Sequence, residues 1–271
     1  MKAQTQKLFN DIINCPFLTT GDCLKITGCQ NHLPKRQVPE PWNGDIEKSS
    51  FLIIGSNPAL VDNEVYPSKD VCWHSWVGFW NSSSVQEFFN GRFGKAICQA
   101  NGQPFVDVKK STVLTHNGAN LVRRPFQNGY WKAYNEMCSA ISHSFKPWDF
   151  VVTDIVHCKS SQQIGVASSR KLCMNYLKNI ISIFANNGAE EHHVLIIGSD
   201  RSEKNLSMIK SFGWSFSNKQ EIGISAKGDP INMYDLDVNG VHVNLYHRIP
   251  APSGANRSKS PIRFFSAEIK W

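Results

Sequence analysis

The chain has 271 residues, of which 41% are hydrophobic and 11% aromatic, so it carries enough apolar side chains for a packed core. This composition excludes a disordered or fibrous protein, and apolar runs of only four residues, at 51–54 and 194–197, exclude a membrane-spanning helix. The 29 basic and 22 acidic residues give a net charge of +7, which permits binding to a polyanion without establishing it.

The first residues lack the apolar stretch of a secretory signal peptide, so we expect the protein to stay in the cytoplasm. In that compartment the eight cysteines are expected to be thiols or metal ligands rather than disulfides. Residues 28–43 are rich in proline and polar residues and predict an ordered loop wrapped on the body. We therefore expect residues 1–271 to form a single domain, with 1–48 as an N-terminal wrap.

Four short runs rich in β-branched residues predict buried strands at 50–54, 150–156, 194–197 and 241–246. Helical spacing of apolar residues predicts helices at 85–97, at 129–143, from Ser168 or Ser169 to Gly188, and from Ser202 onward. Short apolar strands that alternate with helices predict an α/β fold. We expect a single α/β/α domain with a central, mostly parallel four-stranded sheet, and function in the loops after the strands.

The first of these loops is the turn Gly55-Ser56-Asn57-Pro58-Ala59, which directly follows the first predicted strand. Glycine allows a tight turn and proline fixes it, so Asn57 is held at the strand tip with an amide that can orient a water molecule. The alternative is an ordinary turn asparagine that bonds its own backbone.

Two further motifs follow along the chain. Thr153-Asp154-Ile155-Val156-His157-Cys158 ends the second predicted strand, and Cys173 follows on the next helix. The last strand ends in residues 251–257, a small, flexible and basic loop of the kind that approaches a phosphate backbone.

In chain order these motifs resemble those of the uracil-DNA glycosylase superfamily, over roughly residues 15–260. The Gly55–Ala59 turn is similar to that of the mismatch-specific and single-strand-selective branches, and the Thr153–Cys158 strand resembles that of the iron–sulfur branches. The resemblance implies that Asn57 positions the attacking water and that Ser56 contributes to base recognition. Each motif is short, so the resemblance is carried by their order.

Asp154 stands where members of the superfamily usually carry the asparagine that reads the edge of uracil. An amide matches both the N3–H donor and the O4 acceptor of uracil, whereas an ionised carboxylate only accepts. A carboxylate suits the exocyclic N4–H₂ of cytosine. The departure therefore predicts a cytosine-type base; the alternative is a structural carboxylate paired with a nearby arginine or histidine.

Unmodified cytosine of the host cannot be the substrate without killing the cell, so the predicted base carries a modification at C5. The chain resembles the bacterial anti-phage glycosylases of the superfamily, which remove α-glucosylated 5-hydroxymethylcytosine from phage DNA. The aromatic segment 66–80 is predicted to line the larger pocket, with Trp73 or Tyr66 as the stacking ring and Trp73 preferred. Core packing is the alternative for most of these rings.

Many relatives begin the closing loop with a histidine that stabilises charge on the departing base, but this chain has Ala251 there. His247 is predicted to replace it, with Arg248 as an alternative; both also fit strand-end residues that face solvent or phosphate. The predicted contacts to the DNA backbone come from the closing loop: Ser253, Gly254, Asn256 and Arg257. Arg123, Arg124 and Lys259 are further candidates, for which a plain surface charge is the alternative.

The resemblance also implies a [4Fe–4S] cluster held by two pairs of cysteines, Cys23 with Cys29 and Cys158 with Cys173. The later pair has the spacing of the iron–sulfur branch, whereas Cys23 and Cys29 are separated by five residues instead of two. The sequence leaves open whether Cys15 or Cys23 is a ligand, and buried thiols that pack as small hydrophobes are the alternative.

From these observations we predict a monofunctional, monomeric DNA glycosylase that acts in antiviral defence, with no membrane partner. Three alternatives stay open. They are an iron–sulfur uracil-DNA glycosylase, a catalytically weak module that binds a modified base, and a different α/β enzyme such as a nucleotide hydrolase built around Gly198-Ser199-Asp200.

Overall fold

A computed structural model describes residues 1–21, 23–60, 62, 66–78, 80–90, 97–98, 104–107, 112–114, 121–122, 128–146, 149–198, 202–225, 229–249 and 262–264. The side chains are described except at 97–133, 202, 225 and 262–264. The chain divides into two compact units. Unit 1 comprises Met1–Gly44, Asn57–Phe126 and Thr153–Leu177, and unit 2 comprises Asp45–Ser56, Gln127–Val152 and Lys178–Trp271.

All four predicted strands form and are neighbours in one sheet, in the order β12-β9-β2-β8. Their bounds are Phe51–Gly55 for β2, Phe150–Asp154 for β8, His193–Ile197 for β9 and Val241–Ile249 for β12. The central strand β9 pairs in parallel with β2 and with β12. Because every residue of β9 is buried, its sequence is a continuous apolar run after His193, as expected of a parallel strand covered on both faces. The α/β class is thus confirmed.

The sheet is wider than predicted, because three antiparallel strands extend it beyond β12. They are β10 (Ser215–Ser225), β11 (Pro230–Val238) and β13 (Ile262–Phe264), which complete a seven-stranded mixed sheet. The prediction of four strands was wrong in number. Strand β11 alternates buried and exposed residues, and much of β10 is exposed, so neither contains the apolar run that identifies a central strand.

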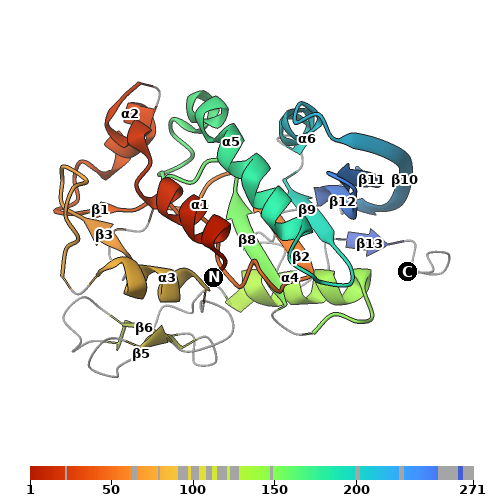
Figure 1. The fold of residues 1–271 in the computed structure, drawn as a ribbon, viewed down its shortest axis with the longest axis horizontal. Coiled ribbons are helices and arrows are strands. Elements are labelled where there is room, and N and C mark those ends of the chain that lie inside the picture. Colours follow the sequence, from red (N-terminus) through yellow and green to blue (C-terminus); the bar gives the residue numbers. More distant parts are fainter. Residues whose placement is uncertain are drawn as a thin grey trace. The chain divides into compact units, whose positions relative to one another are not determined.

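Helices of unit 2 bury apolar side chains against this sheet. Helix α6 (Ser202–Lys210) contacts β9 and β12, which lie side by side in Figure 1. Helix α4 (Asn128–Ile141) places Tyr134 against Phe150 of β8, with the ring centroids 6.0 Å apart. Both helices were predicted from the spacing of their apolar residues, and α6 carries Glu203 in its first turn, where a negative charge stabilises a helix.

Unit 1 contains short elements that the sequence analysis did not predict. They are α1 (Ala3–Ile13), η1 (Pro16–Thr19), α2 (Cys23–Thr27), η2 (Gly28–Gln30) and the strand pair β1 (Arg36–Gln37) and β3 (Ser68–Lys69). A small sheet of order β4-β5-β6-β7 is formed by Ile97–Cys98, Pro104–Asp107, Thr112–Leu114 and Leu121–Val122. Phe9 of α1 packs edge-on against Trp42 and Phe89, and these rings form the aromatic core of the unit.

The predicted helix at 85–97 is α3, which spans Ser82–Asn90 and buries Val85, Phe88 and Phe89. The helix predicted between Ser168 and Gly188 is α5, which spans Val166–Ala185. Directly before α5, Gly165 has φ of +77°, and a Cβ atom at this position would lie 2.6 Å from the backbone nitrogen of Ile26. Only glycine allows α2 to approach the start of α5 so closely.

The loop predicted from residues 28–43 is ordered, as expected. Gln30 closes it by donating from Nε2 to the carbonyl of Gln37, 3.2 Å away, and by accepting the Gln37 backbone N–H at 2.7 Å. Residues 37–44 are all buried. The loop therefore brings polar side chains from the N-terminal part of the chain into the interior of unit 1.

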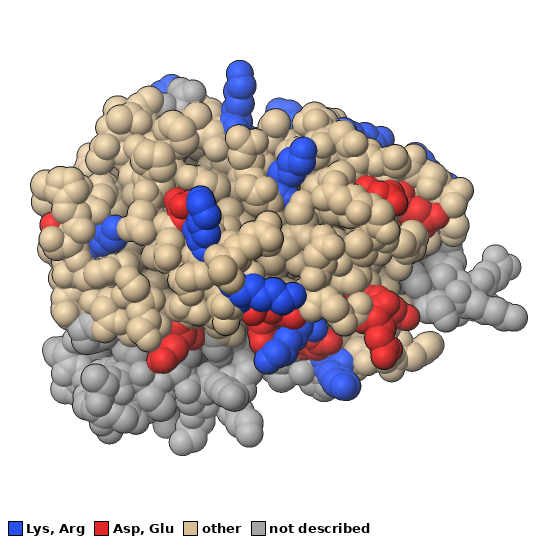
Figure 2. All heavy atoms as spheres, in the orientation of Figure 1, with Lys and Arg blue, Asp and Glu red and all other residues tan. Residues whose placement is uncertain are grey.

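The charged residues give no concentrated basic surface on the face shown in Figure 2. Lys and Arg side chains of the described residues are scattered over the upper part of this face, and those near its lower middle lie together with acidic ones. No helix in the described part of the chain is long and apolar enough to cross a membrane.

Candidate functional site

The turn after β2 lies beside residues 158–160 of unit 1. Leu60 donates its backbone N–H to the carbonyl of Ser160 at 3.1 Å, and Ser160 donates its own to the carbonyl of Pro58 at 3.2 Å. Asn57 donates from Nδ2 to Oγ of Ser160 and to the carbonyl of Pro58, both at 3.0 Å. These four bonds fix the amide of Asn57, and one of them is the local bond to the backbone that the simpler alternative predicts.

The side-chain oxygen of Asn57 has no donor among the described residues. This oxygen, Oδ1, is buried. A buried acceptor without a donor costs about 1–3 kcal/mol, so such an atom is normally satisfied by a ligand or an ordered water. The fixed amide is therefore able to accept a hydrogen bond from a water molecule, which is the role predicted for Asn57.

Glu40, which the sequence analysis did not single out, is held by donors at both carboxylate oxygens. The hydroxyl of Tyr66 donates to Oε2 at 2.9 Å, and Nδ2 of Asn43 donates to Oε1. The backbone N–H of Glu40 donates to the carbonyl of His157 at 2.8 Å. These bonds anchor the N-terminal loop to the segment that follows β8.

Asp154 lies at the carboxyl end of β8 and is only partly buried. Removal of its carboxyl group from water and the negative charge of Glu40 raise the pKa of Asp154 well above its ordinary value, and the nearby charge of Lys159 lowers it by less. No described residue donates a hydrogen bond to Asp154. The adjacent Thr153 is fixed by a 2.7 Å bond from Oγ1 to the carbonyl of Pro41.

The raised pKa changes the premise on which the base was predicted from sequence. That prediction treated Asp154 as an ionised carboxylate, which only accepts hydrogen bonds. A protonated carboxyl group instead offers one donor and one acceptor, as an amide does. Asp154 is therefore able to match the edge of cytosine, with acceptor N3 and donor N4–H₂, and also the edge of uracil.

Lys159 is almost completely buried, at 2% exposure, and its Nζ lies 3.7 Å above the ring centroid of Tyr66. A lysine this deep requires compensating charge or a π face, and Lys159 has the Tyr66 ring in addition to the two carboxyl groups. Burial also lowers the pKa of His157 to about 4, so its imidazole is neutral. His157 Nδ1 donates to the carbonyl of Glu40 at 2.9 Å.

The aromatic residues predicted to stack on a base have different environments. Tyr66 is fully buried among Phe88, Phe89 and Lys159, so its ring offers no open face. Trp73 is partly exposed in a turn where its own φ is +68°, an unusual value for a side chain of this size. Of the two predicted rings, Trp73 is thus the one accessible to a ligand.

Four cysteine side chains of unit 1 form one buried group. Cys158 hydrogen-bonds with Cys23, and this bond, burial and the neighbouring thiols Cys173, Cys23 and Cys15 together raise the pKa of Cys158 well above its ordinary value. Burial, together with Cys23 and Cys15, raises the pKa of Cys173 to about 12. The raised pKa values favour the protonated thiols of Cys158 and Cys173 in the absence of a bound cation.

The group differs in one member from the predicted set. Cys29 is partly exposed, and its Sγ donates to the carbonyl of Lys25 at 3.7 Å, within its own helical turn. Cys15 takes its place, because η1 returns the chain toward α2 and brings Cys15 beside Cys23 and Tyr176. The spacing argument that paired Cys29 with Cys23 is corrected by this arrangement.

Four thiols are the donor set that iron–sulfur clusters use. A cluster also has the positive charge needed to deprotonate buried thiols. Within the described residues, however, no three or more His, Cys, Asp or Glu side chains have the arrangement that would hold a single metal ion. The donor types thus suit an iron–sulfur cluster, and they equally suit a four-thiolate zinc site.

Two other predicted residues, His247 and Arg248, belong to unit 2. His247 is buried beside Tyr234 and lies 4.0 Å from Glu203. Arg248 pairs with Glu203 at 2.6 Å, and Ser56 is partly buried directly after β2. The other predicted residues lie outside the described part of the chain: Ala251, Ser253, Gly254, Asn256, Arg257, Lys259, Arg123, Arg124, Ser199 and Asp200.

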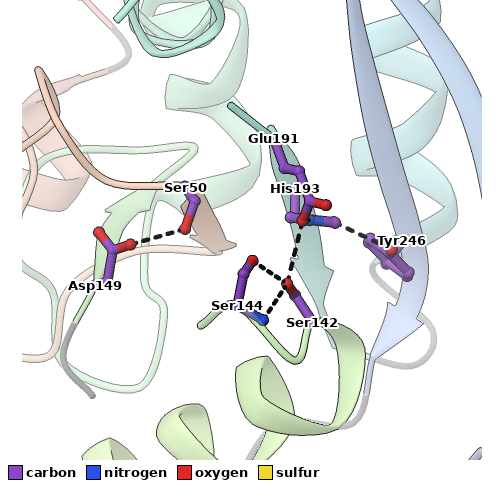
Figure 3. A network of polar contacts seen from close by, with 7 residues as sticks. All are labelled: Ser50, Ser142, Ser144, Asp149, Glu191, His193 and Tyr246. Carbon is purple, nitrogen blue, oxygen red and sulfur yellow. Dashed lines mark hydrogen bonds and ion pairs between the residues drawn. The ribbon is translucent and has the colours of Figure 1, made fainter. Parts of the chain in front are cut away.

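Unit 2 contains a second polar network, shown in Figure 3. His193, the first residue of β9, lies between Glu191, 3.1 Å from Nε2, and the hydroxyl of Tyr246, 3.2 Å from Nδ1. Ser142 donates to Glu191 at 3.1 Å rather than to the imidazole, so this serine is not positioned for activation by the histidine. The network lies at the amino end of β9 and connects it to Ser142, directly after α4, and to Tyr246 within β12.

The comparisons with known proteins add no family to this description. No family model, curated protein or solved structure matches the chain.

Proposed function

We propose that the protein is a monofunctional DNA glycosylase that hydrolyses the N-glycosidic bond of a flipped-out, C5-modified cytosine, with α-glucosylated 5-hydroxymethylcytosine of phage DNA as the preferred base. The observation that carries the proposal is the combination, within unit 1, of a fixed amide whose buried acceptor receives no bond from a described residue and a partly buried aspartate at a strand end. The first suits a nucleophilic water and the second suits the edge of a base.

Each residue has a defined task in this proposal. The base leaves the helix and enters the site, since its glycosidic bond is inaccessible within the stacked duplex. Oδ1 of Asn57 accepts a hydrogen bond from the water that attacks C1′, and Ser160 keeps the amide in that orientation. Asp154 contacts the Watson–Crick edge of the base, and burial with the negative charge of Glu40 favours its protonated form against the smaller opposing effect of Lys159.

Cys15, Cys23, Cys158 and Cys173 would hold a [4Fe–4S] cluster that links the N-terminal segment to α5 and stabilises the fold. These thiols come from separate segments of unit 1. Cys15 follows α1, Cys23 begins α2, Cys158 follows β8, and Cys173 lies on α5. Their contribution is structural, since the hydrolysis of a glycosidic bond involves no change in oxidation state.

One observation favours a second candidate, an iron–sulfur uracil-DNA glycosylase. A protonated Asp154 is able to accept from N3–H of uracil and to donate to O4, as the usual asparagine does. The raised pKa therefore removes the electrostatic argument against uracil that the sequence supplied.

A panel of oligonucleotides tests both candidates. Single- and double-stranded DNA carrying uracil, 5-hydroxymethylcytosine or its α-glucosylated form is incubated with the protein and then cleaved at abasic sites with alkali. Cleavage at the glucosylated base supports the proposal, whereas cleavage at uracil alone assigns the second candidate. Binding without cleavage on every oligonucleotide would identify a module that recognises the base without hydrolysis.

A further inference from the structure

We infer that Asp154 is the general acid of the reaction: it donates its proton to N3 of the flipped cytosine, so that the base departs neutral. This inference rests on the proposed function and adds to it the group that assists the departure of the base. It follows from the charges around Asp154, from its position at the end of β8, and from the chemistry of cytosine.

The first argument is the distribution of charge in the buried group. Glu40, Asp154 and Lys159 bring two carboxyl groups and one ammonium together, so one proton on a carboxyl group makes the cluster neutral. Both oxygens of Glu40 are already bonded to donors, Tyr66 and Asn43, which stabilise its ionised form. Asp154 receives no such bond from a described residue, so the proton is held there.

The second argument is access. Glu40 and Lys159 are buried, with 7% and 2% of their surfaces exposed, whereas Asp154 is only partly buried. Of the three groups, Asp154 is thus the one that a ligand at the strand end is able to contact. His157 also lies nearby, but it donates Nδ1–H to the Glu40 carbonyl and has a pKa of about 4, so it carries no transferable charge near neutral pH.

The third argument is the base itself. N3 of cytosine is its basic ring nitrogen, and the neighbouring N4–H₂ is a donor, so a carboxylic acid binds this edge through two hydrogen bonds, O–H to N3 and N4–H to C=O. N3 of uracil already carries hydrogen and accepts no proton. The same acid therefore recognises both bases, but it activates only cytosine.

The reaction balances without any further reactant. The proton moves from the Asp154 carboxyl group to N3, and the C1′–N1 bond breaks with its electron pair going to N1, which releases neutral cytosine as its N3–H tautomer. Water adds its oxygen to C1′ of the sugar cation, and the proton it loses restores Asp154. Transfer of this kind contributes about 10²–10⁴ in rate.

The test is a two-by-two comparison of wild type and Asp154→Asn on DNA carrying the released base and its 3-deaza analogue, in which C–H replaces N3. We expect wild type to be 10²–10⁴ faster on the natural base than on the analogue, and the variant to be equally slow on both. Asp149→Asn, the same change at the other end of β8, should behave as wild type. Single-turnover rates and DNA affinity are measured together, so that altered binding is separated from altered chemistry.

A second readout is the pH profile of the rate. Release should fall as pH rises through the pKa of Asp154. Glu40→Gln removes the negative charge that helps raise this pKa, so the fall should move to lower pH. A merely structural role of either residue would not move the profile.

Three results would overturn the inference while leaving a glycosylase in place. The first is that the analogue slows wild type and Asp154→Asn by the same factor relative to the natural base. The second is full activity of Asp154→Asn, and the third is release of uracil alone. A wild-type protein that releases no base from any oligonucleotide would instead refute the proposed function itself.

Discussion

The hydroxyl of Tyr66 donates a hydrogen bond to Oε2 of Glu40 across 2.9 Å, and both side chains are buried. This contact gives Tyr66 a role different from the stacking ring that its position in the sequence predicts. It stabilises the negative charge of Glu40, and that charge in turn favours a proton on Asp154. The aromatic residue thus contributes to the acid–base properties of the site from within the core.

Replacement of Asn57 by alanine should abolish base release while DNA binding persists. The variant loses the acceptor for the attacking water, and removal of such a positioned polar group lowers the rate by about 10²–10³. Single-turnover release and a gel-shift assay measure the two properties separately. Asn186→Ala, at an exposed asparagine, is the control. Activity within a few-fold of wild type would remove Asn57 from the mechanism.

Asp154→Asn should be more stable than wild type above neutral pH. The folded state raises the pKa of Asp154, so it stabilises the protonated form, and that stabilisation is lost as pH rises through the raised pKa. Asparagine has no ionised form, so the difference in melting temperature between variant and wild type should grow with pH. Thermal melts from pH 5 to 9 measure it, with Asp149→Asn as control. A constant difference would contradict the assigned pKa.

Cys15→Ala, Cys158→Ala and Cys173→Ala should each lose the iron that we expect in anaerobically purified protein, together with its brown colour. Cys29→Ala should keep both, because Cys29 lies outside the buried thiol group. Iron and sulfide analysis with visible absorption provides the measurement. Loss of iron from the Cys29 variant but not from the Cys15 variant would restore the set predicted from sequence, and iron-free wild type would leave the cysteines as core thiols.

Acid should destabilise unit 2 through His193. Burial lowers the pKa of this histidine, against smaller opposing effects of Glu191, so the unfolded chain binds a proton more readily as pH falls through its ordinary value of 6.5. The free energy of unfolding should therefore decrease between pH 7.5 and 5.5, and less so in His193→Gln. Urea denaturation measures this change, and His143→Gln, at an exposed histidine, is the control. Identical pH dependence in both variants would exclude His193 as the cause.

The sequence predicts the centre of the sheet well because β2, β8 and β9 are buried runs, and such runs leave a local signal in the sequence. It does not predict β10 and β11, whose residues are largely polar or alternating, or β13, whose only described strand partner is β10. Helix α1 was missed, although Leu8, Phe9, Ile12 and Ile13 have the spacing of a buried helical face.

The site shows the same division between local and distant information. The positions of Asn57 and Asp154 at strand ends were predicted because such an end leaves a local signal in the sequence. Glu40 and Lys159 were not, because a single acid in a proline-rich loop and a single lysine after a strand resemble surface charges until the fold brings them together. Cys15 was left as an alternative for a similar reason, since linear spacing does not reveal that η1 turns the chain back.

Gly165 lies close to Ile26, and this approach is possible only because glycine has no Cβ atom. The arrangement of the four buried cysteines therefore depends on the glycine. A single methyl group at residue 165 would overlap the backbone of α2, the helix that begins at Cys23, while α5, which carries Cys173, starts one residue later. A substitution at residue 165, which is not a ligand and carries no charge, would therefore change the spacing between the sulfur atoms. A search for residues that govern cofactor content in this chain should begin with such contacts between backbones, and not only with the cysteines.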